Sequence, residues 1–177
     1  MDVYKQKWTT LEQEVFSLLC KRVGEKLSQR EIAKILNVSP TAVSNVVKAL
    51  KDLAIVEKTK TINFVSLNRD NSKMIDLKRI ENLKSLYVTG LSDFLKFELT
   101  GSTIILFGSY SMGEDAHSSD IDFAVIGRKD KLLRLEKYEK LLNRPINVNF
   151  YPNWSSINRN LKNNILNGIL LHGSVEL

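Results

Sequence analysis

The chain has little of several residue types that would point to particular classes of protein. Its 177 residues include one cysteine, Cys20, which excludes an internal disulfide and a zinc site built from several cysteines. The two histidines, His117 and His172, lie far apart, and their spacing is not that of a metal-binding pair. No apolar run approaches the roughly 20 residues of a membrane-spanning helix. We therefore exclude a disulfide scaffold and expect no association with a membrane.

Composition and charge describe a globular protein with a modest positive excess. Apolar residues make up 43% of the chain and charged residues 26%, and the formal net charge is +6 with a pI near 9.4. The first five residues do not have the pattern of a signal peptide, so we expect a cytoplasmic protein. The first 70 residues carry twelve Lys and Arg against eight Asp and Glu. This excess is compatible with a polyanionic partner near the N-terminus.

The N-terminal region has the pattern of three short helices. Apolar residues recur at helical spacing between Thr9 and Val23, and Gly24 ends that pattern. Ser28 and Glu31 form the capping box of a second helix that reaches about Leu36. Ser39 is the expected cap of a third helix, with a proline at its first position. The spacing of the second and third helices resembles a helix-turn-helix.

The third helix and the segment after it suggest contact with DNA. An apolar stripe predicts the buried face of this helix, and short polar side chains with a lysine remain outside. Two short strands around a basic turn follow, between Ile55 and Leu67, and resemble the wing of winged helix-turn-helix transcription regulators. The residues that we expect to face bases or phosphates are Thr41, Ala42, Ser44, Asn45, Lys48, Lys58 and Lys60.

DNA binding is not the only function that this arrangement allows. The same arrangement of helices also serves in protein docking or dimerisation, although the chemistry of the exposed face favours double-stranded DNA. One copy would read one half-site, so tight binding predicts a homodimer on half-sites about 34–36 Å apart, or a multiple of that distance.

A polar segment without periodicity, residues 68–73, marks the expected boundary between two domains, which we place near Asn71. The predicted fold class is α+β. Residues 1–70 form a winged helix-turn-helix domain, and residues 71–177 form a domain of helices on a mixed sheet. In that second domain we expect helices on both sides of Gly90 and near residues 133–142 and 154–167.

The strongest chemical signal lies between Gly108 and Asp122. An apolar, β-branched strand ends at a Gly-Ser pair, Gly108 and Ser109, and ten residues later two aspartates follow with one residue between them. Asp120 and Asp122 lie at the start of an alternating strand, so their carboxylates leave the same face, roughly 6.6–6.8 Å apart along it. Paired carboxylates of this kind suit divalent ions in phosphoryl and nucleotidyl transfer.

This Gly-Ser and Asp-x-Asp spacing resembles the signature of polymerase-beta-type nucleotidyltransferases, and most closely the minimal ones. The resemblance implies that Gly108 and Ser109 bind the phosphates of a nucleoside triphosphate such as ATP. It implies that Asp120 and Asp122 bind Mg²⁺, or Mn²⁺, and are the catalytic acids. Gly113 matches the turn that follows the first short helix in this family.

The chain departs from the family at the third carboxylate. The strand expected to carry it, residues 145–151, has Asn147 and Asn149 at the alternating positions. An amide oxygen can bind a metal but brings no negative charge, so nucleotide binding is better supported than turnover. Glu136 and Glu139 are candidates for the missing charge, although both lie in a helical pattern that favours a solvent-exposed face as their explanation.

Three functions are compatible with these observations. The first is a DNA-binding protein whose nucleotidyltransferase domain binds a nucleoside triphosphate with Mg²⁺. The second is an enzyme that transfers a nucleoside monophosphate to a hydroxyl group; the resemblance makes a toxin partner of the HEPN type conceivable, with this chain as antitoxin. The third is a transcriptional regulator with a degenerate catalytic fold that senses a ligand or dimerises.

Overall fold

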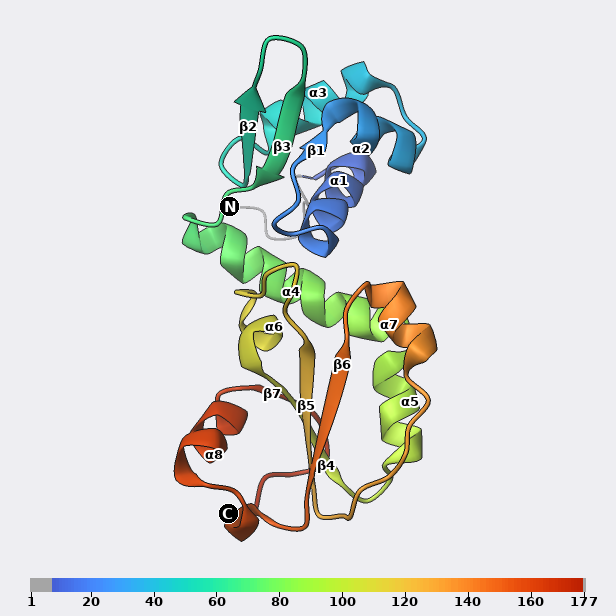
Figure 1. Cartoon of the computed structure of the whole chain (residues 1–177), viewed down its shortest axis with the longest axis vertical. Coiled ribbons are helices and arrows are strands. Elements are labelled where there is room, and N and C mark those ends of the chain that lie inside the picture. The colour runs from blue at the N-terminus through green and yellow to red at the C-terminus, as the bar shows by residue number, and fades with distance from the viewer. Residues whose placement is uncertain (1–7, 177) are drawn as a thin grey trace. The chain divides into compact units, whose positions relative to one another are not determined.

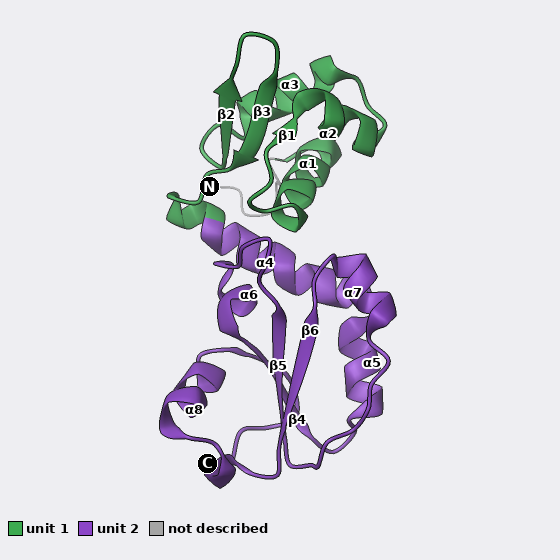
Figure 2. Cartoon of the chain, in the orientation of Figure 1, with its two compact units in different colours: residues 1–74 green, residues 75–177 purple. Residues whose placement is uncertain are grey.

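The computed structural model describes residues 8–176, so the first seven residues of the predicted N-terminal domain lie outside the described part. Contacts divide the chain after Met74 into two compact units (Figure 2), whereas the sequence placed the boundary near Asn71. The division falls inside one helix, α4 (Ser72–Val88), which continues from the first unit into the second. The structure is of the mixed α and β class that the sequence predicted.

The first unit is a winged helix. Between residue 8 and the start of α4 it contains three helices and a small sheet with strand order β1-β3-β2, and in this sheet all neighbours are antiparallel (Figure 1). The sequence expected the β2 and β3 hairpin but not the short strand β1. The elements are α1 (Thr10–Lys21), β1 (Leu27–Ser28), α2 (Gln29–Leu36), α3 (Pro40–Ala49), β2 (Ala54–Lys58) and β3 (Asn63–Leu67).

The three helices of this unit begin where capping chemistry predicts. Thr9 and Ser28 form capping boxes with the glutamates three residues later, and the Ser39 hydroxyl accepts the backbone N–H of Ala42. The buried stripe of α3 consists of Val43, Val46 and Val47, as its spacing predicted. Cys20 is buried on the inner side of α1. Packing of the valine stripe determines which side of α3 faces the solvent.

Loss of the Ser28 cap is expected to lower the free energy of unfolding by about 1 kcal/mol. The Ser28 hydroxyl accepts the backbone N–H of Glu31 at 3.1 Å, and a Glu31 carboxylate oxygen accepts the N–H of Ser28 at 2.7 Å. The bond from the Ser28 backbone N–H, and after it the Ser28 side chain, lower the pKa of the Glu31 carboxylate below its ordinary 4.5. The contribution of the carboxylate is therefore complete above that pKa and is lost as the pH falls through the lowered one.

Urea denaturation of Ser28→Ala at neutral pH measures this effect. Glu31→Gln is the matched control, because glutamine still offers an oxygen to the N–H of Ser28, and its loss of stability should be smaller. An unchanged denaturation midpoint for Ser28→Ala would contradict the role of the cap.

The second unit is a four-stranded mixed sheet with helices on both faces (Figure 1). The strand order is β6-β5-β4-β7, in which β5 and β6 run parallel and the other neighbours antiparallel. The elements are α4, α5 (Leu91–Glu98), β4 (Thr103–Phe107), α6 (Gly108–Met112), β5 (Ile121–Ile126), α7 (Glu136–Leu142), β6 (Ile146–Tyr151), the 3-10 helix η1 (Trp154–Ser156), α8 (Arg159–Leu166) and β7 (Ile169–His172).

Alternation along the strands assigns side chains to the two faces of this sheet. Ile121, Phe123 and Val125 of β5 point into a core shared with α5 and α7. Ala124 and Ile126 point into the opposite core, which Trp154 and Ile165 close. Asp122 follows the alternation of Ala124 and therefore lies on the same face as α8, at the far end of the strand. An acidic pair thus lies at the edge of a well-packed apolar layer.

Candidate functional site

The Gly-Ser corner lies directly beside the second aspartate. Phe107, the last residue of β4, pairs with Asp122 of β5, and Gly108 then turns into α6 with a φ of 75°. A Cβ atom at Gly108 would lie 2.9 Å from a carboxylate oxygen of Asp122. Because of both the positive φ and this close approach, only glycine suits the position. The backbone after β4 can therefore approach whatever Asp122 binds.

The two aspartates converge on a single amide. The Nδ2 of Asn147 donates to an oxygen of Asp120 at 2.9 Å and to an oxygen of Asp122 at 3.1 Å. The register explains this contact, since Asp122 pairs directly with Asn147 across the parallel strands β5 and β6. Two like-charged groups that share one donor lie close together, and the amide dipole offsets part of their repulsion.

The structure distinguishes the two asparagines of β6. Asn147 takes the position beside the aspartates, where the resemblance expected a third carboxylate. Asn149 pairs with Ala124 instead, and its Nδ2 lies 3.5 Å from the carbonyl oxygen of Phe123. Glu139 does not supply the missing charge, because its Oε1 accepts the backbone N–H of Ile146 at 3.0 Å. Residues 8–176 contain no cluster of three or more His, Cys, Asp or Glu side chains that could bind a metal.

The donor set fits one divalent cation that arrives with a triphosphate. Asp120 and Asp122 present hard carboxylate oxygens, which Mg²⁺ and Mn²⁺ prefer. The ion keeps several waters and commonly takes phosphate oxygens as its remaining ligands, so two protein carboxylates suffice. A second ion about 3.5–4 Å away would normally share a further carboxylate. Where that further carboxylate is expected, the chain has the neutral side chain of Asn147.

The candidate DNA face lies on α3 and on the hairpin of β2 and β3. Thr41, Asn45 and Lys48 are exposed on α3, and Ala42 and Ser44 are half-buried beside them. Lys58 ends β2, and Lys60 lies in the turn before β3; both are exposed. All seven residues that the sequence assigned to DNA contact therefore belong to one helix and one adjacent hairpin.

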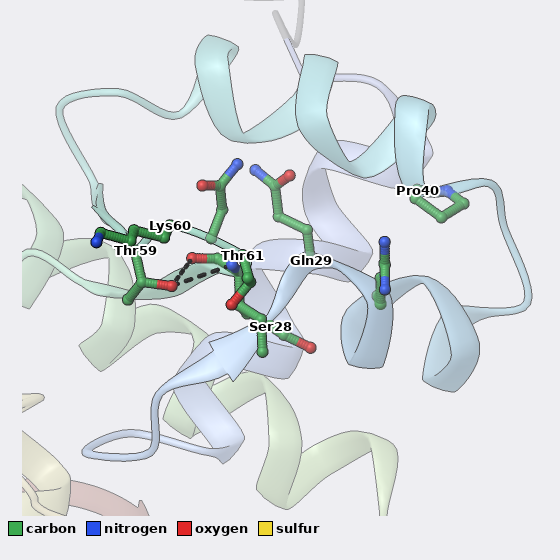
Figure 3. Close-up of a pocket in the computed structure, with 9 residues that line it drawn as sticks. Ser28, Gln29, Pro40, Thr59, Lys60 and Thr61 are labelled. Atoms are coloured by element: carbon green, nitrogen blue, oxygen red, sulfur yellow. Dashed lines mark hydrogen bonds between the residues drawn. The ribbon is translucent and has the colours of Figure 1, made fainter.

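Two hollows lie along this face. The larger, of about 570 Å³, has an apolar floor of Val47, Ala54 and Val56 and three lysines, Lys48, Lys51 and Lys58. The second, of about 420 Å³, is lined by the start of α2, the start of α3 and the turn of the hairpin (Figure 3). Lys51, which the sequence also expects to neutralise phosphates, lines the larger hollow. The hollows further contain polar residues that the sequence did not assign to DNA contact, among them Gln29, Arg30 and Asn63.

Comparison with protein families identifies both parts of the chain. Residues 17–62 match the model of the MarR family, and residues 88–172 match the model of the nucleotidyltransferase domain. Comparisons with curated proteins and with solved structures gave no significant match. Among the described residues, no helix has both the length and the apolar character that a membrane crossing requires.

The two family matches cover the two units in the order that the sequence motifs indicated. They support a DNA-binding regulator that carries a nucleotidyltransferase fold. The matches over residues 17–62, to the MarR family, and over residues 88–172, to the nucleotidyltransferase domain, thus agree with the fusion of a winged helix with a nucleotidyltransferase domain that the motifs indicated.

Proposed function

We propose that the protein is a nucleotide-responsive DNA-binding regulator. Gly108 and Ser109 would bind the phosphates of a nucleoside triphosphate, and Asp120 and Asp122 would bind its Mg²⁺ or Mn²⁺. The winged helix would bind double-stranded DNA through α3 and the β2 and β3 hairpin. Nucleotide binding would change the affinity for DNA only to the extent that the nucleotide binds the DNA-bound protein more or less tightly than the free protein.

The observation that carries this proposal is the position of Asn147. Its amide donates to both aspartates, and this convergence of two acids supports the binding of one cation, while the charge that would bind a second cation is absent. When bound, a divalent cation supplies positive charge that neutralises phosphate oxygens and orients the triphosphate. The pair of acids supports binding, and the missing third acid argues against rapid transfer.

Nucleoside monophosphate transfer is the second candidate, and the closeness of the Gly-Ser corner to Asp122 favours it. In that reaction an acceptor hydroxyl oxygen would attack the α-phosphorus, lose its proton and release pyrophosphate. A small helical protein of the HEPN type is one acceptor to test. Labelled AMP that appears on such a partner with the wild-type chain, and not with Asp120→Ala, would support transfer over sensing.

Calorimetric titration tests the nucleotide half of the proposal. Each of the four ribonucleoside triphosphates is titrated with and without Mg²⁺, and we expect binding that requires the metal. DNA affinity is then measured with and without ATP and Mg²⁺. Metal-dependent binding that leaves DNA affinity unchanged would refute the regulatory link, and no binding of any triphosphate would refute the nucleotide site itself.

The DNA half predicts a loss of affinity when the lysines of the hairpin and of α3 are removed. Replacing Lys48, Lys58 or Lys60 with Ala should weaken binding to all sequences similarly and reduce the slope of log K against log salt by about 1 for each phosphate that is no longer neutralised. Lys34→Ala is the matched control, because Lys34 is exposed at the end of α2 and lines neither hollow. Equal salt slopes for all four variants would contradict this face.

We also propose that the regulator acts as a homodimer. A single winged helix contacts one half-site, and a two-fold dimer would read two half-sites about 34–36 Å apart or a multiple of that distance. Sedimentation of the protein with DNA of one and two half-sites tests this proposal. One chain bound to each DNA molecule under all conditions would refute it.

A further inference from the structure

A buried ionic cluster lies beneath the loop that joins the Gly-Ser corner to the aspartates. Asp115 of this loop is fully buried, and Lys78 of α4 and Arg144, which precedes β6, are nearly so. Lys78 donates to one oxygen of Asp115, and Nη2 of Arg144 lies 2.9 Å from the other. Nδ2 of Asn82, also on α4, donates to Asp115 at 2.7 Å.

This cluster calls for an explanation beyond stability. Removing three charged side chains from water costs more than burying apolar ones of similar size, and an apolar replacement is often as stable. Buried ionic groups are best explained where they fix one particular arrangement of the chain. Here the arrangement that they fix is that of the loop 113–119, which lies between the short helix that begins at the Gly-Ser corner and Asp120.

Hydrogen bonds from the same residues reach both ends of this loop. Nη1 of Arg144 donates to the carbonyl oxygen of Ser119, immediately before Asp120, at 3.1 Å, and it also contacts the carbonyl oxygens of Ala116 and His117. At the other end, Nδ2 of Asn82 donates to the carbonyl oxygen of Tyr110, immediately after Ser109, at 2.9 Å.

The backbone of α4 also lies against this loop. A Cβ atom on Gly113 would lie 2.4 Å from the carbonyl oxygen of Ile75, and Gly113 has a φ of 77°. Glycine is therefore required for this contact. The helix α4 thus touches the loop at Gly113 and Asp115, and it touches the preceding short helix α6 at Tyr110, next to Ser109.

We propose that Asp115, Lys78 and Arg144 are positioning residues of the nucleotide site. They fix the separation between the Gly-Ser corner and the aspartates, without touching the nucleotide or its metal. The proposal deepens the proposed function and rests on it. Residues that orient metal ligands from behind typically change affinity or activity by 10–100-fold when mutated, and the same range is expected here.

The first experiment measures affinity for ATP and Mg²⁺ in Asp115→Asn, by calorimetry. We expect a loss of roughly 10–100-fold. Lys78→Met should show a smaller loss in the same direction, because it leaves Asp115 paired with Arg144, and it serves if Asp115→Asn does not fold. Leu95→Ala is the matched control: Leu95 is buried on α5, so this variant loses stability without altering the cluster. We expect its affinity to match the wild type under conditions where it is folded.

The second experiment needs no nucleotide and so separates this proposal from the proposed function. Hydrogen exchange of residues 113–120 is compared in the nucleotide-free wild type, Lys78→Met and Leu95→Ala, and we expect faster exchange only in Lys78→Met. If the wild type binds no nucleotide, the proposed function fails, and this loop-specific change still supports a positioning cluster. Wild-type exchange and wild-type affinity in Lys78→Met, or equal losses in Lys78→Met and Leu95→Ala, would overturn the proposal.

Discussion

Asp120→Ala is expected to remove Mg²⁺-dependent binding of ATP, with a loss in affinity of about 100-fold or more, which corresponds to about 2.7 kcal/mol. The variant removes one of two carboxylates that converge within hydrogen-bonding distance of the Asn147 amide. Affinity for a hard cation depends on the number of charged ligands, and here half of them are removed. Calorimetric titration with ATP and Mg²⁺ measures the effect, with Asp122→Ala as an independent repeat.

Asp130→Ala is the matched control for this prediction. It removes the same charge from the same unit, but Asp130 is exposed in the loop after β5, at the end of the strand opposite to the aspartate pair. The affinity of Asp130→Ala for ATP and Mg²⁺ should stay within a factor of about two of the wild type. The charge of an exposed side chain at the other end of β5 is largely screened by solvent and salt. Equal losses in Asp120→Ala and Asp130→Ala would show that general charge, and not the pair, determines binding.

Asn147→Asp is expected to have two large effects of opposite direction. Without divalent ions, three carboxylates would converge where the amide now donates two hydrogen bonds, and the free energy of unfolding should fall by about 1–3 kcal/mol. With millimolar Mn²⁺, the third carboxylate should allow a second ion to bind, and this binding should restore stability through linkage. Denaturation with and without Mn²⁺ measures the first effect, and counting of bound Mn²⁺ by electron paramagnetic resonance measures the second.

Asn149→Asp provides the control. It makes the same change of charge on the same strand, two residues further along and opposite Ala124 rather than Asp122. We expect one bound Mn²⁺ in this variant, as in the wild type in the presence of ATP. If Asn147→Asp gains neither a second ion nor transfer of AMP, the proposal that Asn147 replaces the third metal-binding acid is wrong.

Local chemistry made much of the fold predictable. Ser28 and Ser39 precede helices because their hydroxyls satisfy backbone N–H groups of the first turn, and this signal depends on three or four neighbouring residues only. The β5 strand was equally clear: Asp122 lies in it, Asp120 immediately precedes its first residue, and the spacing of two residues directs both side chains to one side. The convergence of these acids is therefore a consequence of the sequence spacing.

Interactions between distant residues were not predictable in this way. The pairing of Asp115 with Lys78 and Arg144 joins three separate parts of the chain. Asp115 is one of the unspecified positions between Ser109 and Asp120, and no motif surrounds Lys78 or Arg144. Which of the two β6 asparagines lies beside the aspartates depends on the register of β5 and β6, which one strand alone does not determine.

Two helix predictions were too long for a related reason. The segment 154–167 is not one helix: Ile157 is extended, and Asn158 caps a new helix with its side chain, accepting the N–H of Leu161. The segment 133–142 is helical only from Glu136. In the first segment, apolar residues at helical spacing continue across the break that the Asn158 cap marks; in the second, no side-chain cap marks the start of the helix at Glu136.

The burial of Cys20 inside α1 has a practical consequence for solution studies. A thiol enclosed by apolar neighbours reacts slowly with alkylating reagents, so a cysteine introduced on the exposed turn at Lys60 would label selectively in the otherwise native chain. A second introduced cysteine, at the exposed Asp130, would complete a pair for spin-label or fluorescence distance measurements. Such a pair would report the separation of the two units in solution, with and without ATP and Mg²⁺.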